Sequence, residues 1–277
     1  MKETIFHLQY RGAPKFIGHF IIFNLVGLYY IDNKIYNKIG EDFQITFKDK
    51  TKIVKKPSND ISYPIKIHMD NVVQYMTEAF DIIKDKFILI KELPEDYEII
   101  NIYGGDRYKN NFDFKDTLTY IRELFLNRIT KTPSISYKKI FITRKDSFSS
   151  HNIFKRCIKN EEELKKMLNK YDFTYIVLEN YSFNDKIQLF NYTDIIISSH
   201  SAALTFIIFC KINVKIVEIL NKGTDRFLHD HYKDISKNLK LNGYNRYSSI
   251  TEDKMGNFNI DIKKFEEYLL NHKILEL

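Results

Sequence analysis

The sequence predicts an α/β protein with parallel sheets, and three observations in its second half lead to this fold class. Apolar runs of strand length recur at 139–143, 175–178, 195–198 and 215–220. Segments with helical periodicity follow them, at 161–171, 183–192, 202–209 and 228–241. The runs DIIIS and VKIVEIL are apolar on both faces, as buried parallel strands require. Strands that alternate with helices form βαβ units, so we expect a Rossmann-like domain from about residue 135 onward.

The first half of the chain alternates in the same way, although less regularly. We expect strands at 3–10, 42–47, 63–69 and 98–103, and helices at 17–31, 76–84 and 114–127. The polar segment 127–136, which contains Pro133, is the best linker candidate. The prediction is therefore two α/β domains, residues 1–130 and 135–277.

Composition excludes several classes of protein. Of the 277 residues, 44% are hydrophobic and 29% are charged, and no window holds the ~18 uninterrupted apolar residues of a membrane span. The apolar segment 16–31 begins too far inside for a signal peptide and has no cleavage site, so we expect a cytoplasmic protein. Cys157 and Cys210 are too few for a disulfide framework.

The net charge is +7, from 43 basic and 36 acidic residues. An excess of this size suits nucleic acid, an anionic membrane surface or a small anionic substrate. The basic residues are scattered along the chain, which favours the small anion. Because no recognised nucleic-acid motif is present, we expect no nucleic-acid partner. A basic nucleic-acid- or nucleotide-binding module without catalytic activity remains the alternative function.

Small residues and a histidine lie where the strand 194–198 ends. Ser199 and His200 follow the strand, and Ser201, Ala202 and Ala203 begin the next helix. In a parallel sheet, ligands bind beyond the carboxyl ends of the strands and anions sit on helix N-termini. Small side chains let a ligand approach the backbone N–H groups, Ser201 can cap the helix, and His200 can donate to a phosphate. A capped helix whose histidine bonds a neighbouring loop explains the same residues without a ligand.

Polar residues also occupy the other strand ends. Arg144 and Lys145 follow the first strand, where a guanidinium can hold a phosphate in bidentate fashion. Arg156 precedes a helix start for which Asn160 is the expected cap. Glu218 lies late in an apolar strand, where a carboxylate can accept two ribose hydroxyls. A solvated turn for Arg144 and an ion pair for Glu218 are the purely structural alternatives.

These segments resemble glycosyltransferase family 61. The likeness is carried by an arginine after the first strand, an Arg-x-Ile-x-Asn-Glu segment, a Leu-Glu before Ser-Phe, and a histidine loop before a strand with a late glutamate. The matching residues here are Arg144, Arg156, Asn160, Glu161, Leu178, Glu179, Ser182, Phe183, Lys186, Ile187, His200, Ala202, Leu204 and Glu218. The resemblance covers 139–270 well and the first half only thinly.

The resemblance implies two facing Rossmann-like domains of the GT-B type. Domain 135–277 would hold the nucleotide-sugar donor and domain 1–130 a glycan or glycoprotein acceptor. The implied reaction is an inverting transfer of a xylose- or N-acetylglucosamine-type sugar from a UDP-sugar to a hydroxyl. The expected donor-binding residues are Arg144, Lys145, Arg156, Glu179, His200, Ser201, Ala202, Ala203 and Glu218.

No metal and no further cofactor is expected, because the chain lacks the Asp-x-Asp triplet that holds a divalent cation in GT-A enzymes. Cationic side chains and helix N-termini would stabilise the departing diphosphate instead. The two histidines of the His229-Asp230-His231 segment are at i, i+2 spacing on different helix faces, which argues against a metal site there.

For the general base we favour His19, near the start of a helix after the first strand, since a histidine pKa lies close to operating pH. A structural histidine explains the residue equally well. Asp106, which follows a strand and two glycines, is the rival. Two departures from the family pattern, Ser201 for a glycine and Phe23 for an acid, also leave open a catalytically inactive member.

Overall fold

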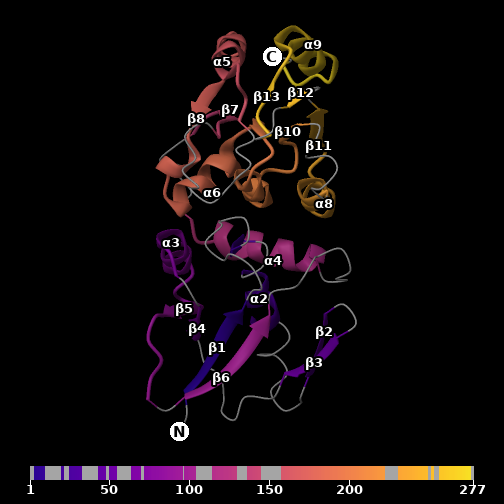
Figure 1. Cartoon of the computed structure of the whole chain (residues 1–277). Helices are drawn as coiled ribbons and strands as arrows, with labels where there is room; N and C mark the ends of the chain where they lie inside the picture. Colours follow the sequence, from indigo (N-terminus) through magenta and orange to yellow (C-terminus); the bar gives the residue numbers. More distant parts are fainter. Residues whose placement is uncertain are drawn as a thin grey trace. The chain divides into compact units, whose positions relative to one another are not determined.

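The computed structural model describes most of the chain. The described residues are 3–9, 20–21, 25–32, 43–47, 50–54, 64–69, 72–95, 97–103, 114–129, 136–144, 157–221, 230–248, 251–252 and 256–275. The chain forms two compact units, Met1–Thr130 and Lys131–Leu277 (Figure 1). The boundary between them lies within the expected linker segment, 127–136.

The N-terminal unit contains a parallel sheet of four strands in the order β5-β4-β1-β6. Their bounds are β1 Glu3–Gln9, β4 Ile65–His68, β5 Phe87–Ile90 and β6 Tyr97–Tyr103. The described helices are α2 Leu25–Tyr30, α3 Gln74–Ile82 and α4 Phe114–Leu126, and β2 Phe43–Phe47 pairs antiparallel with β3 Lys50–Val54. Buried residues at helical spacing, such as Leu118, Ile121 and Phe125 of α4, explain why these segments fold as amphipathic helices.

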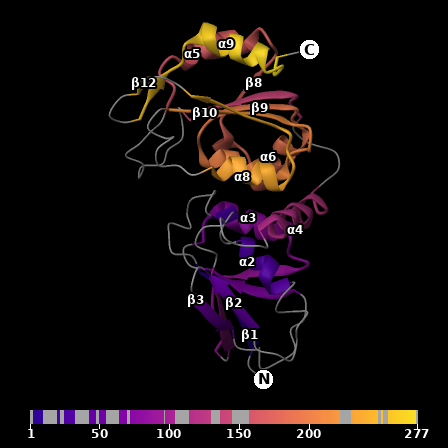
Figure 2. The ribbon, with the colours of Figure 1, turned by 90° about the vertical axis from the view of Figure 1, so that its right-hand side faces the viewer.

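The C-terminal unit contains a parallel sheet of five strands in the order β11-β10-β9-β7-β8. Their bounds are β7 Lys139–Ile142, β8 Thr174–Ile176, β9 Ile195–Ser199, β10 Lys215–Leu220 and β11 Gly243–Ser248. Figure 2 shows α5 Glu161–Asn169 and α9 Ile262–Asn271 on one face of this sheet. On the other face lie α6 Phe183–Tyr192 and α8 His231–Asn238.

Short elements also belong to the described part of this unit. They are the 3₁₀ helices η5 Leu178–Asn180 and η6 Ala202–Phe209 and the antiparallel pair of strands β12 Thr251–Glu252 and β13 Phe258–Asn259. Within the unit the chain runs β7, β8, then back past β7 to β9, β10 and β11. The strand order therefore reverses between β7 and β9, which is the topological switch point of the sheet.

The central strands of the C-terminal sheet, β7, β9 and β10, are buried on both faces, which explains why they read as continuous apolar runs. Phe141, Ile197 and Val217 pack with Leu164 of α5 and Phe265 of α9 in one core cluster. Close packing also explains Gly243 at the start of β11. A Cβ atom there would lie 2.3 Å from the carbonyl oxygen of Val214, so only glycine allows β11 to pair with β10 in this register.

The α/β class with parallel sheets is thus confirmed, and two local expectations are corrected. Asn160 does not cap α5 with its side chain. Its amide group instead pairs with the backbone of Ile260, accepting at 3.0 Å and donating at 2.8 Å. Ser201 precedes η6 without a capping hydrogen bond from its side chain. No helix in the described part of the chain is long and apolar enough to cross a membrane.

Candidate nucleotide-binding edge of the C-terminal sheet

Arg144 and His200 meet at the switch point. Arg144 follows β7 and His200 follows β9, and these neighbouring strands leave the sheet in the same direction. The Arg144 Nη1 donates to the His200 carbonyl oxygen at 2.7 Å. The crevice beyond the carboxyl ends of the strands at such a point is where open α/β sheets bind ligands. Arg144 and His200 therefore lie together at one edge of the sheet, as expected.

His200 is held rigidly by β10. Its backbone N–H donates to the carbonyl oxygen of Ile219 at 2.9 Å, which continues the β9–β10 ladder by one residue. Its ring nitrogen Nδ1 is hydrogen-bonded to Oε1 of Glu218. His200 is 7% exposed and Glu218 is 0% exposed. Because Nδ1 is occupied by the carboxylate, a ligand could be contacted only through Nε2.

Two residues of β11 hold the second oxygen of Glu218. The Tyr244 hydroxyl donates to Oε2, and the Arg246 Nε donates to the same oxygen at 3.0 Å. The Arg246 Nη1 also donates to Asp230 at 2.5 Å, which ties β11 to the start of α8. Both carboxylate oxygens of Glu218 are therefore engaged by protein side chains. The described geometry is that of a buried ion pair, and the direct ribose contact stays a prediction.

The charge state of this cluster follows from its surroundings. Burial alone would raise the pKa of Glu218, but the hydrogen bonds from His200 and Tyr244 and the charge of Arg246 outweigh it and hold the pKa below its ordinary value. Burial, and then the Glu218 carboxylate, raise the pKa of Tyr244. Glu218 is therefore an anion at neutral pH, and Tyr244 keeps the proton that it donates.

Small residues, Ser201, Ala202 and Ala203, follow His200. Ser201 has φ −156° and ψ 162°, which is extended backbone, so serine in place of the family's glycine causes no left-handed strain. Its carbonyl oxygen accepts from the Tyr232 hydroxyl at 2.7 Å. Its own Oγ is buried and has no hydrogen-bond partner in the described structure. Ala202 is exposed and Ala203 half-buried, so no large side chain of these two residues blocks access to the loop.

A second buried carboxylate supports the end of β7. Glu161, 2% exposed, accepts from the Thr143 hydroxyl with both oxygens at 2.8 Å, and from the Tyr175 hydroxyl at 2.8 Å. Thr143 directly precedes Arg144, so this contact fixes the backbone from which the guanidinium extends. The sequence identified Glu161 as the last residue of the family-like Arg-x-Ile-x-Asn-Glu segment but did not predict this contact.

Of the remaining predicted site residues, Glu179 is described, and it does not join this cluster. Glu179 is exposed in η5, beyond the end of β8. Lys145, Arg156, His19 and Asp106 lie outside the described residues, as does Phe23. The sequence reasoning missed Tyr232, Tyr244 and Arg246. Tyr244 and Arg246 are two residues apart, a spacing that places both side chains on the same face of a strand. This spacing was the signal in the sequence from which their shared position could have been predicted.

The chain was also compared with models of known protein families. The model of the family described as Glycosyltransferase 61 matches residues 18–217, which is most of the chain. The chain belongs to glycosyltransferase family 61. It is therefore a glycosyltransferase, which moves a sugar from a donor to an acceptor. The family 61 match includes Arg144 and His200 and ends one residue before Glu218, so the β11 residues that hold Glu218 lie beyond it. A comparison with curated proteins found no match.

Proposed function

We propose that this family 61 glycosyltransferase is an inverting, metal-independent enzyme that uses a UDP-sugar. It moves a xylose- or N-acetylglucosamine-type sugar to a hydroxyl of a glycan or protein. The C-terminal unit would bind the donor, and the two units would form the facing domains of a GT-B enzyme. The observation that carries the proposal is the junction of Arg144 and His200 at the switch point, with the Glu218 carboxylate behind the imidazole.

Arg144 is suited to the diphosphate of the donor. A guanidinium has five N–H donors in a fixed fork, and the His200 carbonyl oxygen takes one of them. That contact orients the fork relative to the loop 199–203, so it supports bidentate binding of a phosphate oxygen pair. His200 would add a donor through Nε2 when its imidazole is protonated, because the Glu218 carboxylate accepts from Nδ1 and fixes the orientation of the ring.

The transfer needs a base and a stabilised leaving group, and no covalent intermediate. A base takes the proton from the acceptor hydroxyl, the hydroxyl oxygen forms a bond to the anomeric carbon, and the bond from that carbon to the diphosphate oxygen breaks. UDP leaves with the bonding electron pair. Arg144 and His200 would stabilise the charge that develops on it, together with Lys145 and Arg156 as sequence-based proposals. His19 is the proposed base and Asp106 the alternative.

Metal independence gives a direct test of the proposed donor site. We expect UDP-sugars, presented in a panel of nucleotide sugars with EDTA present, to raise the unfolding temperature of the chain. Binding to the folded state alone stabilises it by ~2.7 kcal/mol at a hundredfold excess over the dissociation constant. Transfer of the sugar should likewise persist in EDTA. Loss of both effects in EDTA, with recovery on adding manganese, would show that a divalent cation holds the diphosphate.

A further inference from the structure

A pocket of about 530 Å³ lies in the N-terminal unit, and none of the residues assigned above is among the described residues that line it. His68, Met69, Val72, Val73, Gln74, Thr77 and Lys91 line it. His68 is the last residue of β4 and Lys91 directly follows β5, so the pocket lies at the carboxyl ends of two parallel strands. The same edge of a parallel sheet is where ligands bind in α/β proteins.

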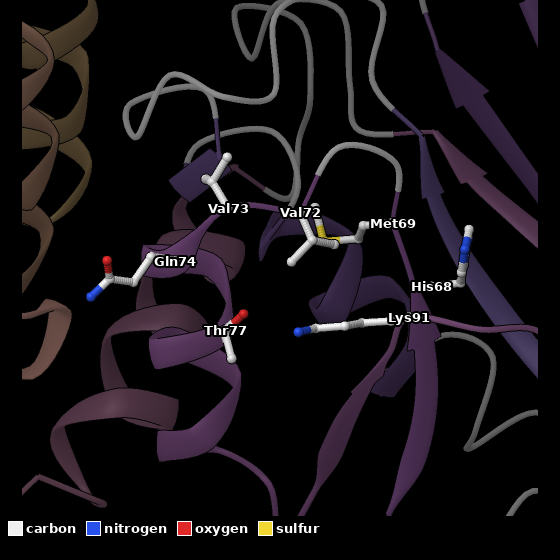
Figure 3. A pocket seen from close by; sticks show the side chains of 7 residues that line it. All are labelled: His68, Met69, Val72, Val73, Gln74, Thr77 and Lys91. Carbon is white, nitrogen blue, oxygen red and sulfur yellow. The ribbon is translucent and has the colours of Figure 1, made fainter.

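The pocket has the electrostatics of an anion site. Figure 3 shows the Lys91 side chain extending from the end of β5 toward Thr77 in the first turn of α3. No acidic side chain is among the described residues that line it. The first turn of α3 contains no acid, and Val73 at its N-cap has no side chain that could bond the first N–H groups. An anion can therefore meet both the ammonium and the positive end of the helix.

His68 adds a second polar group on the β4 side. Its ring packs edge-on against that of His7 of β1, with 4.9 Å between the ring centroids. Its Nδ1 is buried and has no hydrogen-bond partner in the described structure. A buried ring nitrogen without a partner is costly unless a ligand or water satisfies it. Met69, Val72 and Val73 form an apolar part of the wall, which suits the C–H face of a sugar ring.

We propose that this pocket binds the acidic group, a carboxylate or a phosphate, of a glycan. Lys91 and the N-terminus of α3 bind the anion, and the apolar wall contacts the sugar that carries it. Identifying this glycan as the acceptor rests on the proposed function. The enzyme would then select acceptors that carry a negative charge beside the hydroxyl-bearing sugar.

The test is a titration of the full chain, saturated with UDP so that the donor site is filled. The probes are methyl glucuronide, methyl glucoside 6-phosphate and the neutral methyl glucoside, with the backbone amide shifts of Thr77 and Lys91 as readout. We expect one or both anions to bind, and the one that binds identifies the acidic group. Lys91→Gln should weaken that binding about tenfold or more, as expected for loss of a charge-assisted hydrogen bond.

Lys84→Gln is the matched control. The substitution removes the same charge, and Lys84 is exposed and is not among the residues that line the pocket. It should leave anion binding unchanged. Binding of the neutral glucoside as tightly as the anions, equal losses in the two variants, or binding of neither anion would each overturn the proposal. A separate UDP titration of the same protein preparation, before UDP is added to saturation, separates the two claims. Anion binding without UDP binding would sink the proposed function and leave the pocket assignment standing.

Discussion

Glu218→Gln is expected to lower the free energy of unfolding by about 3 kcal/mol, as breaking one side of a buried ion pair commonly does. The glutamine keeps the size of the side chain but removes the negative charge to which His200, Tyr244 and Arg246 are hydrogen-bonded. The loss should lie at the lower end of the usual range, because the Arg246 side chain is 24% exposed and keeps Asp230 as a partner. Denaturant unfolding of the two proteins measures it.

The same substitution should change the response to acid. The folded pKa of Glu218 lies below its ordinary value of 4.5, so between these two values the unfolded chain binds more protons and stability rises with pH. The carboxylate therefore contributes its full stabilisation of the fold at pH values above its ordinary pKa. This stabilisation is lost as the pH falls through the folded pKa. The stability difference between wild type and Glu218→Gln should shrink in this window. A difference that stays constant down to about pH 3 would mean that folding does not lower the pKa of Glu218.

Two tyrosines of β11 provide a matched control for the Glu218 cluster. Tyr244→Phe removes a hydroxyl that donates to Glu218 and should cost about 1 kcal/mol. Tyr247→Phe removes a hydroxyl from the same strand, and that hydroxyl has no hydrogen bond in the described structure. It should be nearly neutral. Equal costs for the two substitutions would contradict a specific role of Tyr244.

His19→Ala is expected to reduce turnover by about 10²–10⁴, the usual share of general base catalysis, while UDP affinity stays near that of the wild type. The base acts on the acceptor hydroxyl and the proposed donor site lies in the other unit, so the two readouts should separate. Turnover of the wild type should also fall at acid pH as the imidazole becomes protonated. Steady-state kinetics and UDP calorimetry on one preparation provide both readouts.

Asp106→Asn serves as the comparison for this prediction. If His19 is the base, the Asp106 variant should retain turnover well above that of His19→Ala. Near wild-type turnover in His19→Ala, with a large loss in Asp106→Asn, would assign the proton transfer to Asp106. A parallel loss of UDP affinity in His19→Ala would place that histidine in donor binding instead.

Three strands of the C-terminal sheet, β7, β9 and β10, were predictable because each is buried on both faces. Ile195–Ser199 and Lys215–Leu220 have apolar runs typical of a covered parallel strand. The ends of β7 and β9 bring Arg144 and His200 to one edge. Strands β3 and β5 were not predicted. Their sequences KTKIV and FILI are short and begin among charged residues, so local pattern does not distinguish them from loops.

The partners of Glu218 were less predictable, because they depend on tertiary register. The chain pattern shows an acid late in a strand but not which side chains face it. The pairing of β10 with β11 places Glu218 opposite Arg246, and Tyr244 lies two residues before it. The same limit applies to Asn160, whose amide bonds Ile260 because α5 and α9 share one face of the sheet. Local capping preference could not reveal that contact.

The central claim, that the Arg144–His200 junction binds the donor diphosphate, is tested most directly by calorimetric titration with UDP. Arg144→Ala should weaken UDP binding by about 1.5–3 kcal/mol, the size of a charge-assisted hydrogen bond. Lys211→Ala removes the same charge at the opposite edge of the sheet, where Lys211 pairs with Asp194 at 2.6 Å, and should leave UDP affinity unchanged. An unchanged affinity in folded Arg144→Ala, or equal losses in both variants, would contradict the assignment.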